Sequence, residues 1–338
     1  MPKLALVFDA SYQTRDLMLS WEDGLRAALS KLGDDWEVHA YTTHGMADFT
    51  LGKVKIHQRP HRESVLTDTR RREFDLALAW GSIDRPLHGF IREVAPKTAL
   101  CFAGGPTQHP FLKNFDLVFA ETPYHLDAFK RQKTNVRLAF GVNTDIFHAN
   151  TWQKPHFLAV HPAAFADYKR YPLFAEAFGE RGLAVGQVQL RADGTVFEGE
   201  TCHEVCLRNG VAIIPRMMPY YMMPYIYGLA EVCAITSTTY GGGDRAVLEA
   251  MACGKPVVIC SDNVKLRMLL PEGYPVADPR PQAIRELAEN LAARPNRLHT
   301  QRSPQRRYER TPERAHVMSK YSVDIYADQL REGLESLL

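Results

Sequence analysis

The chain has 338 residues, which suggests about two domains at roughly 150 residues each. Hydrophobic residues make up 45% and charged residues 24%, the proportions of a soluble globular protein, so the composition excludes a disordered, collagen-like or disulfide-dense chain. Lys and Arg number 41 against 39 Asp and Glu, and this formal charge of +2 excludes a histone-like polyanion binder over the whole chain.

Apolar runs of strand length alternate with amphipathic stretches in the first half of the chain, as in a parallel sheet flanked by helices. A helix is predicted from about Asp16 to Leu32. The predicted strands are residues 4–8, 36–42, 75–80, 98–104 and 116–121. We expect these elements to form one Rossmann-like α/β domain over residues 1–148.

A second series of apolar runs follows a break at residues 141–155. Its predicted strands are 156–161, 183–187, 211–215, 232–236 and 255–261, and its predicted helices are 170–180, 219–230, 244–253 and 280–293. We expect a second doubly wound domain over residues 149–316. The apolar spacing after Met318 predicts a terminal amphipathic helix, and we expect residues 317–338 to pack back towards the first domain.

The six cysteines are scattered, and the apolar run at the start of the chain is too short for a signal peptide, so reduced thiols in the cytoplasm are expected. The longest apolar stretch, Met217 to Ala230, has 14 residues and falls short of the roughly 20 that span a bilayer. No transmembrane helix is therefore predicted. We expect its methionines and tyrosines to pack against the sheet rather than to grip a membrane or an acceptor.

The most informative segment is residues 237–258, where a strand end leads into a glycine triplet and a helix opens at Asp244. Glycines let a backbone approach a ligand closely, and the free N–H groups of a helix start favour an anion. This predicts a phosphate site. The alternative is a plain turn in which Asp244 caps the start of the helix and Gly254 its end.

Three phrases of the sequence resemble those of retaining GT-B glycosyltransferases of the glycogen-synthase and sucrose-synthase type. The first is LeuGluAlaMetAlaCysGlyLysProValVal (248–258) behind the glycine loop. GlyValAsnThrAspIlePhe (141–147) is similar to the interdomain phrase of that family, and PheAlaAspTyrLysArg (165–170) is similar to the first loop of its second domain. The resemblance implies two Rossmann-like doubly wound domains facing a cleft, the first for the acceptor and the second for the donor.

The resemblance also implies roles for single residues. Glu249 falls on the glutamate that accepts hydrogen bonds from both ribose hydroxyls, and Lys169 on the lysine that neutralises the departing diphosphate. The family's first glutamate is Gly241 here, where Asp244 is either its substitute as a catalytic group or a helix cap. The family's arginine is Ala164 here, so Arg170, Arg216 or Arg245 would supply its charge. The donor-binding residues implied are Gly241, Gly242, Gly243, Arg245, Glu249, Arg216 and Arg170.

Acceptor-side candidates lie in the first domain. His109 follows a predicted strand end, where open parallel sheets form a ligand crevice, and it either takes part in catalysis or belongs to a glycine-proline turn. Asp9, Tyr12 and Arg15 follow the first strand. Cys202 and Cys206 form no metal-ligand set with a second pair, so no metal is expected.

Two segments are basic although the whole chain is nearly neutral. Residues 294–320 hold eight basic and two acidic side chains, and residues 53–72 hold seven and two, so their net charges are +6 and +5. Such clusters are solvated faces or footprints of a polyanion. The phrases 165–170, 241–249 and 261–266 are similar to compact phage and archaeal relatives, and some phage GT-B enzymes glycosylate DNA bases. A hydroxymethylated pyrimidine in DNA is therefore one acceptor hypothesis.

The function that the resemblance implies is retaining, metal-independent transfer of a sugar from a nucleotide diphosphate sugar, UDP-sugar first, to a hydroxyl acceptor. The nucleotide sugar is a co-substrate, so no cofactor is expected. The acceptor alternatives are modified DNA and a glycan or lipid-linked sugar. An epimerase or phosphorylase on the same fold, and a non-catalytic nucleotide-sugar-binding module, are the functional alternatives. The sequence leaves the nucleotide, the sugar and the oligomeric state open.

Overall fold

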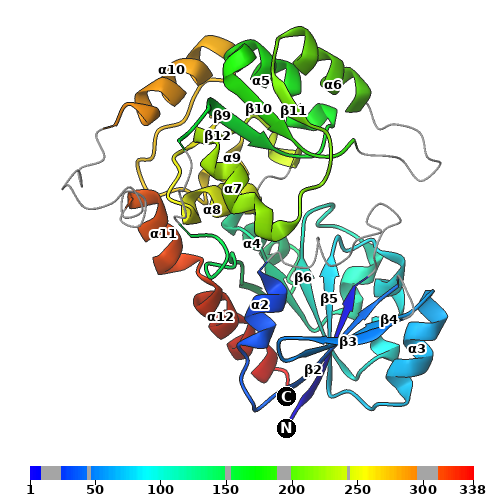
Figure 1. Cartoon of the computed structure of the whole chain (residues 1–338). Coiled ribbons are helices and arrows are strands. Elements are labelled where there is room, and N and C mark those ends of the chain that lie inside the picture. Colours follow the sequence, from blue (N-terminus) through cyan, green and yellow to red (C-terminus); the bar gives the residue numbers. More distant parts are fainter. Residues whose placement is uncertain (9–23, 44–46, 149–153, 189–198, 242–243, 295–310) are drawn as a thin grey trace. The chain divides into compact units, whose positions relative to one another are not determined.

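The computed structural model describes the chain except residues 9–23, 44–46, 149–153, 189–198, 242–243 and 295–310 (Figure 1). Contacts divide it into two compact units. The first unit combines Met1–Gly141 with Val323–Leu338, and the second is Val142–Ser322. The expected boundaries after residues 148 and 316 lie seven residues after and six residues before these.

The first unit is built on an eight-stranded sheet with the order β3-β4-β2-β1-β5-β6-β7-β8. All neighbours are parallel except the edge strand β3, which runs antiparallel to β4. The strands are β1 (Lys3–Phe8), β2 (Glu37–Thr42), β3 (Asp48–Leu51), β4 (Val54–Gln58), β5 (Leu76–Gly81), β6 (Lys97–Phe102), β7 (Leu117–Ala120) and β8 (Val136–Leu138).

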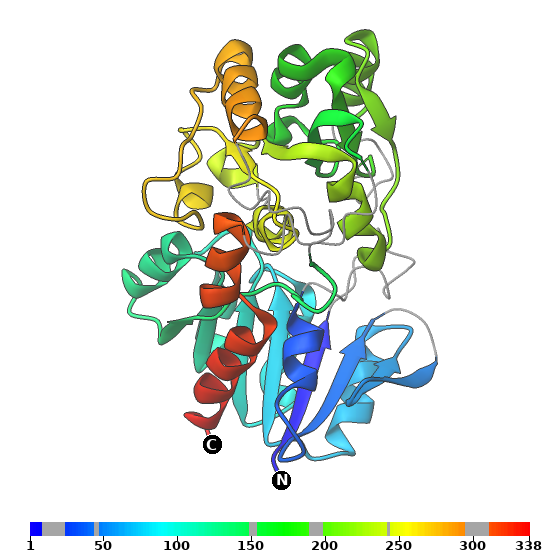
Figure 2. The same ribbon diagram turned by 60° about the vertical axis from the view of Figure 1, so that its left-hand side comes forward.

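Helices cover both faces of this sheet, because alternate residues of a strand point to opposite sides. Leu4 and Leu6 of β1 pack with α2 and α12, which lie side by side in Figure 2, whereas Ala5 and Val7 pack with α3, η1 and α4. The helices are α2 (Leu25–Ser30), α3 (Arg62–Arg70), α4 (Pro123–Lys130) and α12 (Val323–Glu335), with 3-10 helices η1 (Pro86–Glu93) and η2 (Pro110–Asn114).

The second unit holds a five-stranded, fully parallel sheet with the order β11-β10-β9-β12-β13. Its strands are β9 (Phe157–Pro162), β10 (Gly182–Val185), β11 (Ala212–Ile214), β12 (Ala230–Ile235) and β13 (Val257–Ile259). Because all five run the same way, the loops that follow them meet at one edge of the sheet, where parallel sheets bind ligands.

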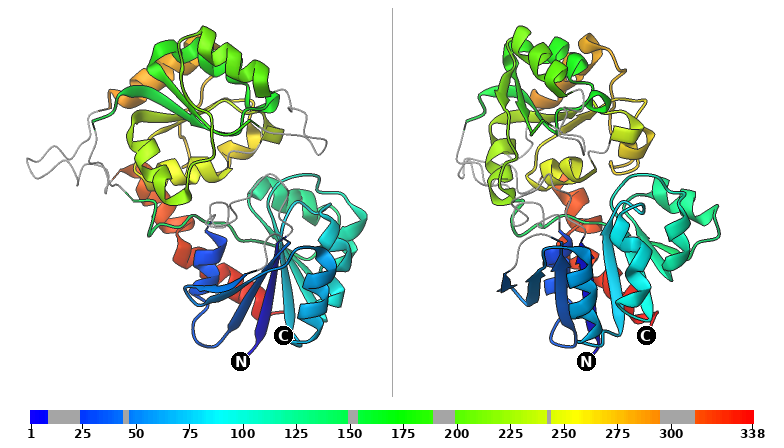
Figure 3. Two further views of the ribbon diagram at one scale, coloured as in Figure 1. Left: turned by 45° about the vertical axis from the view of Figure 1, so that its right-hand side comes forward. Right: turned by 90° about the vertical axis from the view of Figure 1, so that its right-hand side faces the viewer.

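Two helical layers enclose the second sheet. The orange α10 and the green α5 and α6 pack together on one face in Figure 3. Elsewhere α7 and α8 pack with each other and with β12, and α11 packs on α8. The helices are α5 (Tyr171–Phe178), α6 (Gly199–Arg208), α7 (Met223–Gly228), α8 (Asp244–Ala252), α9 (Val264–Arg267), α10 (Pro281–Ala292) and α11 (Pro312–Lys320). The 3-10 helices are η3 (Asp167–Lys169), η4 (Gly179–Arg181), η5 (Tyr220–Met222) and η6 (Thr239–Gly241).

The C-terminal segment differs from its expectation. One amphipathic helix is predicted, but the chain forms α11 and α12 with a break at Tyr321. The Tyr321 carbonyl accepts a hydrogen bond from the Val142 N–H at 2.9 Å instead of one from a helical N–H further along the chain. The described residues contain no helix that is both long and apolar enough to cross a bilayer.

Candidate functional site

The candidate site lies in the second unit, where the loops after β9 and β12 are joined by hydrogen bonds. The Thr236 hydroxyl, one residue beyond β12, donates to the Lys169 carbonyl at 2.8 Å. The Thr238 N–H donates to the Tyr168 carbonyl at 3.0 Å. The peptide that carries the Lys169 side chain is therefore fixed to the loop that leads into the glycine triplet.

A third loop, after β13, is tied to the same place by Asn263. Its side-chain amide donates to the carbonyls of Ser237 and Thr238 at 2.8 and 3.0 Å, and its oxygen accepts the Leu266 N–H at 3.1 Å as the N-cap of α9. Asn263 is fully buried, so each of these bonds replaces one to water. The three loops form a single hydrogen-bonded platform.

Arg170 connects all three loops with its side chain. It takes the left-handed backbone conformation at φ 53° between η3 and α5. Its Nε and Nη2 donate to the carbonyls of Thr236 and Ser237, and its Nη1 and Nη2 form a two-point ion pair with Asp262 at 2.6 and 3.0 Å. Its hydrogen bond holds the pKa of the Asp262 carboxyl below its usual value. These contacts give Arg170 an architectural role, and its predicted contact with a donor stays a prediction.

Lys169 is half-buried, and its Nζ lies 5.4 Å from the centroid of the Tyr168 ring. Its charge also acts on His161, a fully buried side chain at the end of β9. Burial lowers the pKa of His161 to about 4, and the Lys169 charge adds to that effect. His161 Nδ1 lies 2.6 Å from the Ala234 carbonyl, which can only accept, so this nitrogen carries the proton. His161 is thus a neutral imidazole beneath the platform.

Glu249 lies on α8, the helix that follows the glycine triplet. Its side chain is 7% exposed, and its Oε2 accepts a hydrogen bond from the Tyr227 hydroxyl at 2.7 Å. Gly254, at φ 74°, ends the helix turn, and the Lys255 N–H bonds back to the Ala250 carbonyl at 2.9 Å. The motif that suggested Glu249 therefore encodes a capped helix with a buried carboxylate.

Three of the buried groups around the Glu249 carboxylate do not ionise near neutral pH. Burial, helped by the negative charge of Glu249, raises the pKa of Tyr227, Cys233 and Cys253 far above their ordinary values.

All six cysteines of the chain are buried free thiols. Burial raises the pKa of Cys202 to about 11 and that of Cys206 to about 12. No group of side chains in the described ranges has the arrangement of a metal site.

The other predicted donor residues are spread along the same edge. Gly241 ends η6, which contacts η3, and Asp244 begins α8. Arg245 is half-buried on α8. Arg216 is exposed beyond β11, two strands away from β9 in the sheet. Gly242 and Gly243 lie outside the described residues.

The acceptor-side predictions fall in the first unit. The His109 ring accepts the Phe111 N–H at 3.2 Å as the N-cap of η2 and lies edge-on to the Phe111 ring at 4.5 Å. The observed contacts are thus those of a turn, which was the alternative interpretation of His109. Asp9, Tyr12 and Arg15 lie outside the described residues.

Solved structures of other proteins share this architecture. No protein-family model and no curated protein matches the sequence. Sucrose-phosphate synthase from Thermosynechococcus elongatus superposes with a TM-score of 0.71 at 16% identity, covering 100% of this chain and 99% of that one. The chain has the GT-B fold.

Two other neighbours carry the same fold. HepE of Anabaena, solved in complex with UDP and glucose, superposes with a TM-score of 0.68 at 15% identity over 98% of this chain and 99% of its own. The trehalose-6-phosphate synthase OtsA superposes with a TM-score of 0.68 at 9% identity over 99% of both chains. These neighbours are glycosyltransferases, and at such identities the likeness establishes the fold.

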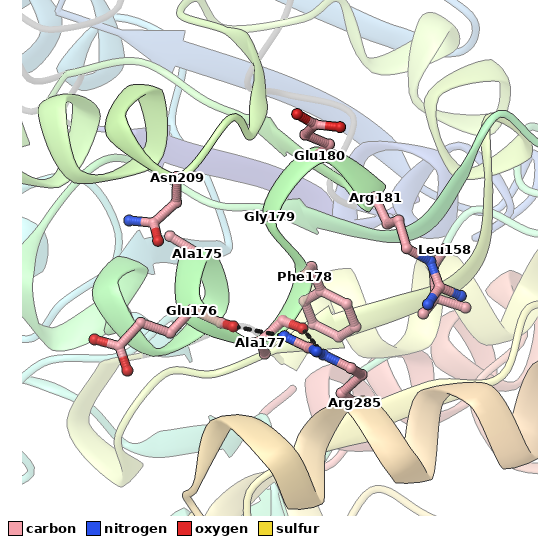
Figure 4. A pocket seen from close by; sticks show the side chains of 10 residues that line it. All are labelled: Leu158, Ala175, Glu176, Ala177, Phe178, Gly179, Glu180, Arg181, Asn209 and Arg285. Atoms are coloured by element: carbon pink, nitrogen blue, oxygen red, sulfur yellow. Dashed lines mark hydrogen bonds between the residues drawn. The ribbon is translucent and has the colours of Figure 1, made fainter.

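A surface pocket of about 320 Å³ lies at the opposite edge of the second sheet (Figure 4). It is lined by Leu158 at the start of β9, by η4 before β10, and by Asn209 before β11. Arg285 donates from Nε and Nη2 to the Ala177 and Glu176 carbonyls at the end of α5. This arginine satisfies carbonyls that a helix end leaves unpaired, so its role in the pocket wall is structural.

Sequence reasoning missed the partners that hold the site residues. Tyr227 was assigned only to a packed stretch, and that stretch is in fact mixed, with Tyr220 and Tyr227 buried and Tyr221 62% exposed. Asn263 carried a usable signal, because Asn before an apolar run is a frequent N-cap. The Arg170–Asp262 pair spans 92 residues and has no local signature.

Proposed function

We propose that this chain is a glycosyltransferase that moves a sugar from a nucleotide diphosphate sugar, UDP-sugar first, to a hydroxyl acceptor with retention at the anomeric carbon. The observation that carries the proposal is the buried Glu249 carboxylate on the helix behind the glycine loop, in a unit whose fold neighbour HepE was solved with UDP and glucose. A carboxylate can accept hydrogen bonds from both hydroxyls of a ribose, and Glu249 lies on α8, the helix for which the resemblance implies this role.

The diphosphate would be bound by the platform and the start of α8. Lys169 is the cation whose peptide the platform fixes, and the first N–H groups of α8 favour negative charge. As the bond between the anomeric carbon and the phosphate oxygen breaks, charge grows on the diphosphate, and a fixed cation stabilises that charge. In the proposed mechanism the acceptor oxygen attacks the same face, and the diphosphate oxygen takes its proton.

The experiment is direct. Purified protein is incubated with UDP-glucose and other nucleotide sugars, and release of the nucleoside diphosphate is measured with and without acceptors. We expect release above background that persists in EDTA, because Lys169 and the helix start take the role of a metal ion. The configuration of the product, read by NMR, tests retention. Binding of UDP without any turnover would instead favour the nucleotide-sugar-binding module.

The acceptor class is the finer part of the proposal, and modified DNA is tested beside glycans and lipid-linked sugars. The basic cluster at 53–72 offers little support, because most of its cations are paired with carboxylates. The pairs are Lys53–Asp34, Lys55–Glu37, Arg59–Asp48, Arg59–Asp68, Arg62–Glu63, Arg70–Glu93 and Arg72–Asp68. A cation that is paired with a carboxylate attracts a phosphate backbone less strongly.

Support for DNA therefore rests on the cluster at 294–320, of which residues 295–310 lie outside the described ranges. Arg314 donates to the carbonyls of Phe147 and Ala252, so it serves the fold. Replacing Arg306, Arg307 and Arg310 should flatten the salt dependence of transfer to hydroxymethylcytosine DNA if DNA is the acceptor. Transfer to a glycan alone, with no mass increment on DNA nucleosides, would exclude DNA and leave the glycosyltransferase proposal standing.

A further inference from the structure

Tyr227 and Glu249 form a buried pair between two neighbouring helices. The Tyr227 side chain is fully buried on α7, and its hydroxyl donates to Glu249 Oε2 on α8 at 2.7 Å. This distance lies within the range expected for a hydroxyl donating to a carboxylate, the stronger kind of hydrogen bond. The contact joins residues 22 positions apart, so the helix pair itself holds the carboxylate in one orientation.

The surroundings of this pair make the hydroxyl important. Cys233 on β12 and Cys253 at the end of α8 are buried beside Glu249, and the Phe147 ring lies 6.2 Å from that of Tyr227. Apolar burial favours the protonated form of a carboxyl group, whereas an O–H donor favours the ionised form. The tyrosine therefore opposes the effect of burial, in the same direction as the Lys255 and Arg314 cations that act on the neighbouring Cys253.

We propose that Tyr227 is a positioning residue of the donor site: its hydroxyl orients the Glu249 carboxylate towards the ribose hydroxyls of a nucleoside diphosphate and keeps that carboxylate ionised. The inference rests on the function proposed above. Tyr227 acts through Glu249 and makes no contact with the donor itself, because its side chain is fully buried.

Charged and titratable groups around the pair come from four neighbouring parts of the second unit. They are Cys233 on β12, Cys253 at the end of α8, Lys255 before β13 and Arg314 on α11. Burial raises the pKa of the two thiols and of the Tyr227 hydroxyl well above neutrality. These three groups therefore keep their protons between pH 5 and 8. The terminal phosphate of UDP titrates at about pH 6 with either protein, so it is the difference in acid sensitivity between the variant and the wild type that reports Glu249.

The test is Tyr227→Phe, which keeps the ring and removes only the donor. UDP and 2′-deoxy-UDP affinities are measured by titration calorimetry from pH 5.5 to 8. We expect UDP affinity to fall about tenfold and 2′-deoxy-UDP affinity less than threefold, since the deoxy nucleotide already lacks one partner of the carboxylate. We also expect the acid loss of UDP binding to begin at higher pH in the variant. In a Glu249→Gln background, Tyr227→Phe should change UDP affinity less than twofold.

The matched control is Tyr274→Phe. The Tyr274 hydroxyl also donates to a buried glutamate, Glu313 on α11, at 3.1 Å, so the same substitution removes the same kind of bond elsewhere in this unit. It removes in addition the acceptor of the Val257 N–H, so the control is at least as disruptive as the test variant. It should leave the pH profile of UDP binding unchanged. An equal loss for UDP and 2′-deoxy-UDP, or an unshifted pH profile in Tyr227→Phe, would overturn the positioning role. Wild-type protein that binds no nucleoside diphosphate would instead refute the proposed function, and that result precedes any variant.

Discussion

Arg170 allows a sharp choice between an architectural and a ligand-binding arginine. Its guanidinium bonds to the carbonyls of Thr236 and Ser237 and to both oxygens of Asp262. Two substitutions separate the roles. Arg170→Ala removes the charge and the fork, whereas Arg170→Lys keeps the charge and loses the two-point geometry.

The expected loss of stability follows from these contacts. Each hydrogen bond to a partly buried carbonyl contributes about 1 kcal/mol. The Asp262 side chain is 45% exposed, so the ion pair is discounted for solvent screening to about 0.5–1 kcal/mol. Arg170→Ala should therefore lower the free energy of unfolding by about 2–3 kcal/mol. Arg170→Lys should recover less than half of that, because one ammonium cannot reach all three loops.

The assay is urea unfolding of both variants together with UDP affinity. Both variants should lose stability and part of their UDP affinity, because the platform loses the Arg170 contacts with Thr236, Ser237 and Asp262. Arg216→Ala is the control, since its exposed side chain should affect stability by less than about 0.5 kcal/mol. The reasoning is refuted if Arg170→Ala is as stable as wild type and Arg170→Lys restores UDP affinity, because the charge alone would then act on the donor.

Four further predictions concern other residues. Glu249→Ala should weaken UDP-sugar binding by about 1.5–3 kcal/mol in calorimetry without unfolding the protein, the range for hydrogen bonds to a charged group. Lys169→Ala should lower kcat more than donor affinity in steady-state kinetics, because the charge it meets grows in the transition state; an effect on KM alone would make it a binding group. His161 is neutral in the fold, with a pKa of about 4 against an ordinary 6.5, so below pH 6.5 it takes up a proton on unfolding and the protein loses stability as the pH is lowered. Denaturation should show a loss of about 2 kcal/mol in the free energy of unfolding from pH 7 to pH 5, and this loss should be absent in His161→Gln. Gly333→Ala should lower the melting temperature, because a Cβ there would lie within van der Waals overlap of the Phe119 ring, and an unchanged temperature would contradict the packing of α12 on the first sheet.

The strands were the most predictable part of the fold. Buried parallel strands consist of nearly continuous apolar runs, and the runs at 4–8, 98–104 and 156–161 contain or overlap β1, β6 and β9. β3 and β4 were not predicted, because Asp48–Leu51 and Val54–Gln58 alternate polar and apolar residues near the sheet edge and include charged and histidine side chains. Edge strands need fewer apolar residues, so they give a weaker signal.

The charge cluster at 53–72 shows that ion pairs between distant residues cannot be predicted from the composition of a sequence segment. The sequence counts its cations, but their partners Asp34, Asp48 and Glu93 come from other elements. Ion pairs form between residues that the sheet brings together, and composition within a window cannot show them. The same reasoning explains Arg170, one of three arginines that the sequence offered for a single role, since its partner Asp262 follows β13.

The platform explains how a site can depend on residues that do not touch a ligand. A cation stabilises a developing charge best when it is already in place, because no reorganisation is then needed during the reaction. The backbone of Lys169 is held by Thr236, the loop of Thr236 is held by Asn263, and Arg170 crosses all three loops. Loosening any of these bonds should therefore weaken the effect of Lys169 on turnover while its charge remains. The strongest test of preorganisation is Thr236→Val, which removes one hydroxyl, and which should lower kcat although every charged residue of the site is retained.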